Sequence, residues 1–171
     1  MVQMSSEALR NNLSNPQRTY LWDFIIPNPI AGGDRDVLQL RCQSTSLPGR
    51  SFGSILVNYK QSAGVKYPGK LAYSHSWDCT FIEGEDAKIF DAIYDWKQQI
   101  VNDLTNTGIS DLLIKTDAIL KLVDRAGTVT RKIKIIGIYP EALPDVPLDY
   151  NSEGNLMLPV TWSFDRWEDI S

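Results

Sequence analysis

Alternation of apolar and polar side chains in the last third of the chain limits the possible fold more than any other feature. The pattern is clearest in residues 156–165, where every second residue is apolar: Leu156, Leu158, Val160, Trp162 and Phe164. A period of two with one apolar face predicts a half-buried β-strand. Residues 129–138 alternate in the same way, and residues 119–124 form a short apolar segment before them. The connection 124–128 contains Gly127, so the two segments are predicted to form a hairpin.

Further strands are predicted over residues 20–26, 37–46, 54–60 and 76–83. In 76–83 the inward residues are Trp77, Cys79 and Phe81. In 37–46 one face is formed by Leu38, Leu40 and Cys42, and the polar face by Gln39, Arg41 and Gln43. Residues 61–73 are rich in Gly, Lys and Tyr, with a turn at Pro68-Gly69, which favours an extended hairpin arm or a long loop.

One helix is expected after Gly84-Glu85-Asp86, whose carboxylates suit a helix N-terminus. Its apolar stripe has the spacing i, i+4, i+7 and i+11, formed by Ile89, Ile93, Trp96 and Ile100. About seven strands and one helix predict a mainly β protein, a β-sandwich or open barrel with the helix packed against one edge. The polar residues 1–18 are expected to be a flexible arm, and residues 19–171 a single domain.

Composition excludes several function classes. A net charge of −4 provides no basic footprint for nucleic acid. No apolar run is long enough to span a membrane, and the N-terminus lacks the pattern of a signal peptide, so expression in a cytoplasm is the default expectation. Two cysteines, Cys42 and Cys79, are too few for a disulfide framework or a zinc site, and free buried thiols are favoured over a disulfide.

Three patterns could carry chemistry, and a structural explanation is favoured for each. Residues 64–71 nearly match the phosphate-binding pattern GxxxxGK[ST], but Leu71 replaces the hydroxyl residue. His75 lies between Ser74 and Ser76, which point to the opposite face of a strand. The carboxylates Glu83, Glu85 and Asp86 suit the start of the helix. The sequence therefore predicts no enzyme, no cofactor and no metal. Trp22 and Trp167, near the ends of the chain, are candidates for an interface.

Three motifs follow one another in the last third of the chain, Gly137-Ile138-Tyr139-Pro140, Leu148-Asp149-Tyr150-Asn151 and Asp165-Arg166-Trp167-Glu168. In this order they resemble the tail tube proteins of contractile-tailed bacteriophages. The resemblance extends more weakly to residues 41–48 and to a tryptophan-bearing strand followed by a helix. The chain departs from the family in a longer arm near residues 64–69 and in residues 31–35.

This resemblance implies hexameric rings that stack into a tube inside a contractile sheath, with four strands of each subunit in an inner β-barrel. Strands ~4.8 Å apart and tilted ~40° would give a barrel radius of roughly 25 Å. The channel of about 40 Å would pass a DNA duplex of about 20 Å, without specific binding. The implied partners are further copies of the chain, the sheath, the tape measure protein and the baseplate and tail terminator proteins. The implied location is the virion, after assembly in the host cytoplasm.

Candidate residues follow from the resemblance and the patterns together. The polar faces of residues 37–46 and 54–60 are expected to line the lumen, with Gln39, Arg41 and Gln43 as candidates. Contacts between subunits or rings are expected from the arm and the C-terminal motif: Lys60, Lys66, Tyr67, Lys70, Arg166, Trp167 and Glu168. The N-terminal residues are a further candidate for ring-to-ring contact.

Three alternatives remain at this stage. The same fold serves as the tube subunit of bacterial contractile secretion or injection machines, and as a baseplate tube initiator. From another class, a small β-barrel binding module or hydrolase would use His75 or the cluster of Glu83, Glu85 and Asp86.

Overall fold

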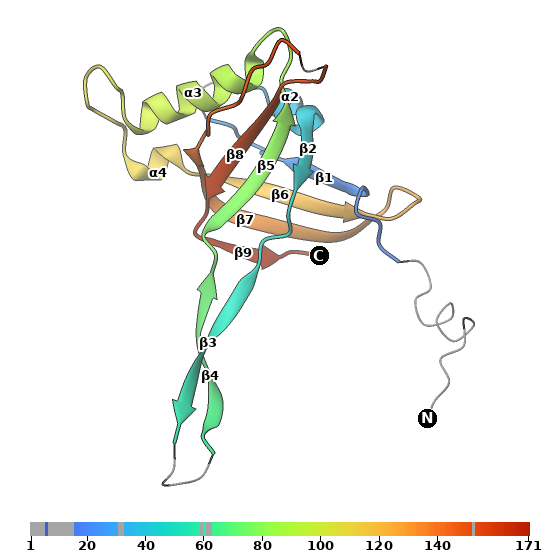
Figure 1. The fold of residues 1–171 in the computed structure, drawn as a ribbon, viewed down its shortest axis with the longest axis vertical. Helices are drawn as coiled ribbons and strands as arrows, with labels where there is room; N and C mark the ends of the chain where they lie inside the picture. The colour runs from blue at the N-terminus through green and yellow to red at the C-terminus, as the bar shows by residue number, and fades with distance from the viewer. Residues whose placement is uncertain (1–5, 7–15, 31–32, 59, 61–62, 152) are drawn as a thin grey trace.

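Two antiparallel sheets share one long strand, β7 (Val129–Ala142) (Figure 1). The structure, a computed structural model, describes residues 6, 16–30, 33–58, 60, 63–151 and 153–171. In the first sheet, residues 129–138 of β7 pair with β6 (Thr116–Val123), and β6 pairs with β1 (Trp22–Ile25). The C-terminal strand β9 (Arg166–Asp169) pairs with the other edge of β7.

The second sheet begins where β7 leaves the first. Its last residues, from Tyr139 to Ala142, pair with β8 (Met157–Ser163). Strand β8 pairs with β5 (Ser76–Ile82), and β5 pairs with the edge strand β2 (Cys42–Thr45). In Figure 1 the strands of this sheet cross those of the first steeply, as in an orthogonal β-sandwich.

The corner in β7 depends on Gly137. Its φ of +71° lies in the left-handed region, and a Cβ at this position would also collide with the side chain of Asp165. A register shift between Pro140 and Ala142 then bends the strand toward β8. Glycine at this position therefore allows one strand to serve both sheets.

The core lies between the two sheets and is strongly aromatic. Alternate residues of β5 and β8 point inward as predicted, with Trp77, Phe81 and Trp162 fully buried. From the first sheet, Phe24 meets Trp77 edge-on at a ring-centroid distance of 5.3 Å. Full burial of one such side chain contributes about 1.5–3 kcal/mol, so this cluster accounts for much of the stability of the sandwich.

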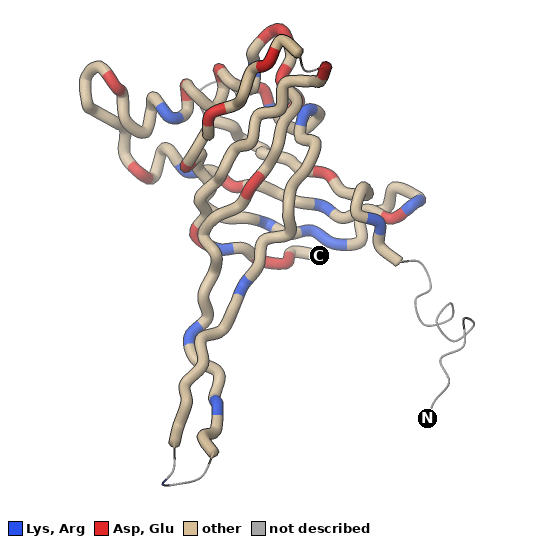
Figure 2. The backbone as a smooth tube through the Cα atoms, viewed as in Figure 1, with Lys and Arg blue, Asp and Glu red and all other residues tan. Residues whose placement is uncertain are grey.

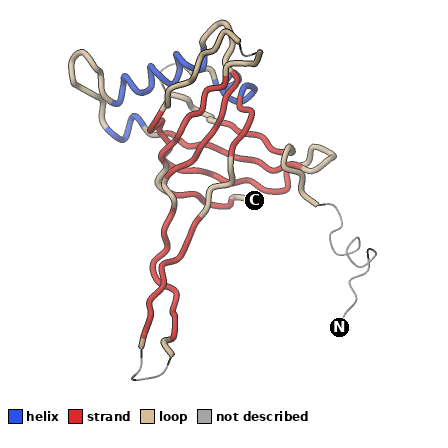
Figure 3. The backbone as a smooth tube through the Cα atoms, in the orientation of Figure 1, coloured by secondary structure: helices blue, strands red, loops and turns tan. Residues whose placement is uncertain are grey.

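The predicted helix is α3 (Lys88–Ile100), which covers one end of the sandwich (Figure 3). Its inward residues are Ile89, Ile93 and Trp96, and Trp96 packs edge-on against Trp162 at 5.4 Å. The indole N–H of Trp96 donates to the carbonyl oxygen of Ile114 at 2.8 Å. This bond ties α3 to the short helix α4 (Asp111–Ile114), which the sequence pattern did not indicate.

The predicted strand over residues 37–46 is wrong in its first half. Residues 35–41 form helix α2 (Arg35–Arg41), and only β2 follows as a strand. The side chain of Asp34 caps the helix by accepting from the amides of Asp36 at 2.9 Å and Val37 at 3.4 Å. Leu38 is buried, but Leu40 is 84% exposed, so the alternation of leucines does not mark a core-facing strand.

The remaining strands form a long hairpin that projects from the body, β3 (Arg50–Val57) and β4 (Val65–Tyr73). The expected extended arm is therefore confirmed, and Figure 1 shows it continuing the direction of β2 and β5. Both cysteines are free; Cys79 is buried, and burial raises the pKa of its thiol. The expected N-terminal arm lies almost wholly outside the described residues. Among the described helices, none is long and apolar enough to cross a membrane.

Candidate assembly surface

The hairpin formed by β3 and β4, called the arm below, exposes side chains that a lone hairpin cannot bury. The cross-strand pairs Ile55–Tyr67 and Val57–Val65 lie on one face near its tip. These four side chains are 49–56% exposed. An isolated two-stranded hairpin is marginally stable in water, and an exposed apolar surface on one indicates a partner.

Two glycines let the strands of the arm cross closely. Gly53 and Gly69 face each other where the register shifts between Phe52 and Ser54. A Cβ on Gly69 would lie 3.0 Å from the carbonyl carbon and oxygen of Gly53. The bulge and this close approach increase the local twist, so they set the direction in which the tip points.

The base of the arm is held by the C-terminal motif. The indole N–H of Trp167, in β9, donates to the carbonyl oxygen of Gly49 at 3.3 Å. The guanidinium of Arg50 lies 5.1 Å from the centroid of the Trp167 ring, and the ring of Tyr73 meets it edge-on at 6.4 Å. Trp167 therefore contacts both strands of the arm where they leave the body.

The other expected contact residues divide between two places. Lys66, Tyr67 and Lys70 lie on β4, and Lys60 lies in the connection between the two strands of the arm. In β9, Arg166 and Glu168 pair in register with Ile136 and Lys134 of β7. The C-terminal motif thus covers one edge of β7 in the first sheet, and at the same place it holds the base of the arm.

Two of the three expected lumen residues lie on a helix instead of a strand. Gln39 donates to Asp23 at 2.8 Å, which ties α2 to β1. Arg41 donates to both carboxylate oxygens of Asp86, at 2.7 and 2.8 Å, and to Glu83 at 3.3 Å. The expected polar strand face of Gln39, Arg41 and Gln43 is therefore wrong, because the helix turns successive side chains by about 100°. Only Gln43 lies on a strand, β2, where it is exposed.

The carboxylates expected at the start of α3 serve the fold in different ways. Ala87, at the N-cap position, makes no side-chain cap. Instead the side chain of Glu83 accepts from the amides of Gly84 at 2.9 Å, Ile89 at 3.3 Å and Phe90 at 2.7 Å. Asp86 is held by Arg41, and this hydrogen bond lowers the pKa of Asp86 to about 2. The same pair raises the pKa of Arg41.

The residues that might have formed a hydrolase site do not converge. Nδ1 of His75 lies 3.0 Å from the carbonyl oxygen of Phe164, while the hydroxyl of Ser74 donates to the carbonyl oxygen of Ser76 at 3.1 Å. The near-match to a phosphate-binding loop lies in the arm, as the hairpin interpretation required. Among the described residues, no three metal-ligating side chains of the types His, Cys, Asp and Glu are grouped.

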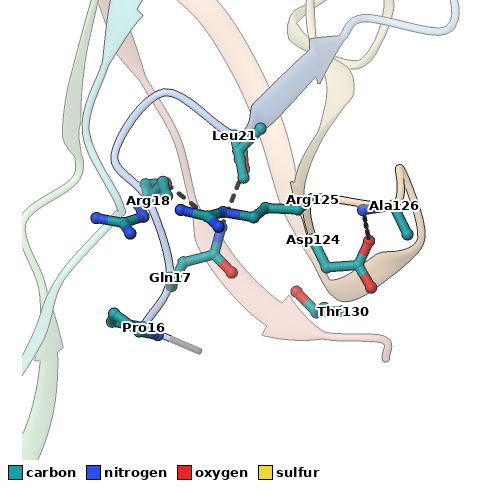
Figure 4. A pocket seen from close by; sticks show the side chains of 8 residues that line it. All are labelled: Pro16, Gln17, Arg18, Leu21, Asp124, Arg125, Ala126 and Thr130. Atoms are coloured by element: carbon teal, nitrogen blue, oxygen red, sulfur yellow. Dashed lines mark hydrogen bonds between the residues drawn. The ribbon is translucent and has the colours of Figure 1, made fainter. Parts of the chain in front are cut away.

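A pocket of about 240 Å³ lies between residues 16–21 and the β6–β7 turn (Figure 4). The amide of Gln17 closes one side by donating to the carbonyl oxygens of Leu21 at 3.2 Å and Val123 at 3.0 Å. The carboxylate that lines the pocket is Asp124. It accepts from the backbone amides of Ala126 and Thr128 at 2.8 Å, so the β6–β7 turn already uses it. The side chains of Arg18 and Arg125 also line the pocket.

The two ends of the molecule carry opposite charge (Figure 2). No Asp or Glu occurs between Asp36 and Asp78, and the arm in this interval carries Arg50, Lys60, Lys66 and Lys70. At the far end, the β5–α3 connection carries Glu83, Glu85 and Asp86, of which Glu83 and Asp86 are paired with Arg41. Residues 143–156 carry Asp145, Asp149 and Glu153 without any Lys or Arg. Opposite charge at opposite ends favours head-to-tail association of copies.

Comparison with known sequences gives a family match over most of the chain. A sequence model of the family described as phage tail tube protein matches residues 26–169. The chain belongs to the phage tail tube protein family. It is therefore a tail component, and its relatives are structural proteins.

Individual relatives agree with this assignment. The chain is 28% identical over 132 residues to tail tube protein gp19 of Enterobacteria phage T4, covering 75% of this tail tube protein and 79% of gp19. Its fold is similar to a chain in the sheath–tube complex of an extracellular contractile injection system, with a TM-score of 0.64, 17% identity and 98% of both chains covered. A chain of the sheath/tube terminator of that system gives a TM-score of 0.67 at 18% identity, covering 92% and 98%.

Proposed function

We propose that this tail tube protein forms hexameric rings that stack into the inner tube of a contractile phage tail, the conduit for DNA ejection. The observation that carries the proposal is the match of the family to residues 26–169. The exposed arm and the open sheet edges supply a physical reason for self-association. The protein acts by its shape, and no reaction is assigned to it.

Ring closure is supported by the edges of the second sheet. Among the described strands, β2 pairs only with β5, and residues 139–142 of β7 pair only with β8. The sheet therefore has four strands and an open edge on each side. Pairing β2 of one copy with the end of β7 of the next would be antiparallel and would continue the sheet around a closed barrel, which removes its edges.

The outward face of this sheet is our revised candidate for the lumen wall. On β5 and β8 the residues that alternate with the core are Ser76, Asp78, Thr80, Ile82, Met157, Pro159, Thr161 and Ser163. The hydroxyl of Thr161 donates to Asp78 at 2.7 Å. This face of β5 and β8 carries Asp78 and no Lys or Arg, and Glu141 is exposed on the end of β7. These strands present no cation to the phosphates, so DNA passes without being held.

Stacking of rings is supported by the charge of the two ends. In a stack, the basic arm of one ring would meet the acidic connections of the next, and Lys66 and Lys70 are candidates for these contacts. Sheath, tape measure, baseplate and tail terminator proteins are the other partners of this proposal, with assembly in the host cytoplasm. The sheath–tube and terminator complexes named above support the sheath and the terminator as partners.

A second candidate function is the tube of a bacterial contractile injection system. It is favoured by the fold similarity to such a system over 98% of the chain. The sequence identity of 28% to a phage protein favours the phage tail. A baseplate tube initiator is a third candidate, since a chain of an anti-feeding prophage baseplate also shares the fold, with a TM-score of 0.66.

Negative-stain electron microscopy of the purified protein tests the proposal. We expect rings and tubes with a central channel, and sedimentation of species much larger than the 19.3 kDa chain. A compact monomer at high concentration, with no rings or tubes under any salt condition, would refute the proposal.

A further inference from the structure

Residues 101–114, which comprise the loop after α3 and the short helix α4, expose three leucines. We call this segment the leucine loop. Leu104 is 95%, Leu112 88% and Leu113 65% exposed. Single exposed leucines are ordinary, but three within ten residues on one projecting segment form an apolar surface that water disfavours.

The leucine loop holds Leu104 outward through its own hydrogen bonds. The side chain of Asn102 accepts from the amides of Leu104 at 3.0 Å and Thr105 at 3.1 Å. The backbone amide of Asn102 donates to Thr107 at 2.8 Å, and Ile109 donates back to Gln99 at 3.1 Å. Because the loop is already ordered, docking of Leu104 costs little conformational entropy.

A seam lies on the opposite side of the body, where the edge strands of the two sheets, β1 and β2, meet (Figure 1). Two hollows of about 260 and 420 Å³ lie in this seam, and Trp22, Thr19 and Thr45 line both. The exposed side chains of Tyr20 and Leu47 also line it. The smaller hollow is mainly apolar, with Leu47, Leu120 and Leu122 in its lining, and it is the part of the β1–β2 seam that suits leucine side chains. The larger hollow is mainly polar, because Asp23, Gln39 and Gln43 also line it.

The charges of the two surfaces are complementary. The leucine loop carries Asp103 and Asp111 and no Lys or Arg. Arg18 lines the smaller hollow of the seam, and Arg125 lines the adjoining pocket at the β6–β7 turn. The carboxylates in these hollows already have partners, since Asp23 accepts from Gln39 and Asp124 accepts from the amides of its own turn. A copy that docks its leucine loop in the seam would place acidic side chains beside these guanidinium groups, which favours this orientation over others.

We propose that the leucine loop of one copy docks in the β1–β2 seam of its neighbour within a ring. The two surfaces differ and lie on opposite sides, so the contact is head-to-tail. Such contacts generate a ring when the rotation between successive copies closes, and an open filament when it does not. The seam lies on the same side of the body as the open edge of β2. The neighbour that pairs with β2 can therefore also place its leucine loop in the seam. This inference rests on the proposed ring and names the surfaces that close it.

The triple variant Leu104→Ser, Leu112→Ser, Leu113→Ser tests the contact. Because these side chains are exposed, the urea midpoint of the monomer should not change, whereas the dissociation constant of the ring should rise by about a hundredfold or more. Leu40→Ser is the matched control, since Leu40 is 84% exposed on α2 and lines neither hollow of the seam. Its rings should be as stable as those of the wild type in sedimentation at low protein concentration.

Crosslinking supplies a second measurement. In a Cys42→Ser background, Leu112→Cys combined with Tyr20→Cys should give a ladder of covalent oligomers with a short bis-maleimide. Either cysteine alone can give at most a dimer. A wild-type chain that forms no ring refutes the proposed function, whereas rings that survive the triple substitution, or a double-cysteine variant that stops at dimers, overturn this inference alone.

Discussion

The indole N–H of Trp167 donates to the carbonyl oxygen of Gly49 at 3.3 Å, and this bond joins the C-terminal strand to the base of the arm. The two residues are far apart in sequence, so the C-terminus fixes the direction of a segment formed much earlier in the chain. Arg50 and Tyr73 pack on the same ring, one from each strand of the arm.

Trp167→Ala should loosen the arm and prevent tube formation. Loss of the cation–π contact, the edge-on aromatic pair and the hydrogen bond should reduce the free energy of unfolding by about 2 kcal/mol. Urea denaturation measures this loss, and electron microscopy measures assembly. Trp167→Phe keeps the ring without the N–H donor, so it should recover most of the stability. Normal tubes from Trp167→Ala would show that the arm needs no anchor at its base.

Glu83→Ala should remove the cap of α3. The Glu83 side chain is only 3% exposed and accepts from three backbone amides and from Arg41. Leaving these donors without an acceptor should cost about 2–3 kcal/mol in the urea-derived free energy of unfolding. Glu85→Ala, at an exposed neighbouring position, should change that free energy by less than about 0.5 kcal/mol. Equal effects of the two substitutions would contradict the capping role.

Sequence patterns predicted the strands whose alternate residues meet the core and the helix whose stripe has the period of 3.6. They failed for α2, because Leu38 and Leu40 satisfy a period of two by coincidence while Asp34 supplies a helix cap. Asp34 is a possible helix cap that can be read from the sequence. Whether this cap or the strand-like alternation of Leu38 and Leu40 decides the local structure depends on tertiary packing. The prediction that Gln39 and Arg41 line the lumen depended on that strand, so it failed as well.

The contacts of Trp167 with the base of the arm could not be predicted from a local sequence pattern. Its position near the C-terminus indicated an interface, but its contacts with Gly49 and Arg50 depend on how β9 joins β7. That pairing is nonlocal and leaves no local periodicity. The leucine loop has a similar explanation, since exposure of Leu104 and Leu112 is a property of the folded surface.

Gly137→Ala should destabilise the fold more than Gly127→Ala. Both glycines have positive φ, +71° and +81°, so each substitution incurs a backbone cost of about 1–2 kcal/mol. Only at Gly137 would the added Cβ also collide with a side chain, that of Asp165, whereas Gly127 has no atom within 4 Å of that position. Thermal unfolding of the two variants measures the difference. Equal losses would show that Asp165, which pairs with Lys115 at 2.7 Å, moves away without cost.

Asp86→Asn should remove part of the acid sensitivity of the fold. The folded pKa of Asp86 is about 2, below the ordinary value of 3.8, because Arg41 donates to the carboxylate. The ion pair therefore stabilises the protein above about pH 4, and this contribution is lost as the pH falls through about 2. The urea midpoint of the variant should lie below that of the wild type at pH 7, and the two should converge near pH 2. Asp91→Asn, at an exposed position of α3, serves as the control and should leave the wild-type pH profile intact.

Gly69→Ala should prevent assembly of tubes without affecting the folding of the sandwich. The new Cβ would lie 3.0 Å from the Gly53 backbone, so the two strands would have to move apart and the tip would point elsewhere. Strands β3 and β4 pair only with each other among the described strands, so the sandwich should keep its urea midpoint and its circular dichroism spectrum.

Tubes should then be absent from electron micrographs of Gly69→Ala, because the basic arm no longer reaches the acidic end of the next ring. Gly49→Ala is the matched control at the base of the arm, where a Cβ meets no atom within 4 Å, and it should assemble as the wild type does. Tubes of wild-type dimensions from Gly69→Ala would mean that the direction of the arm is irrelevant to stacking. Loss of the sandwich itself would instead show that the arm and the body fold as one unit.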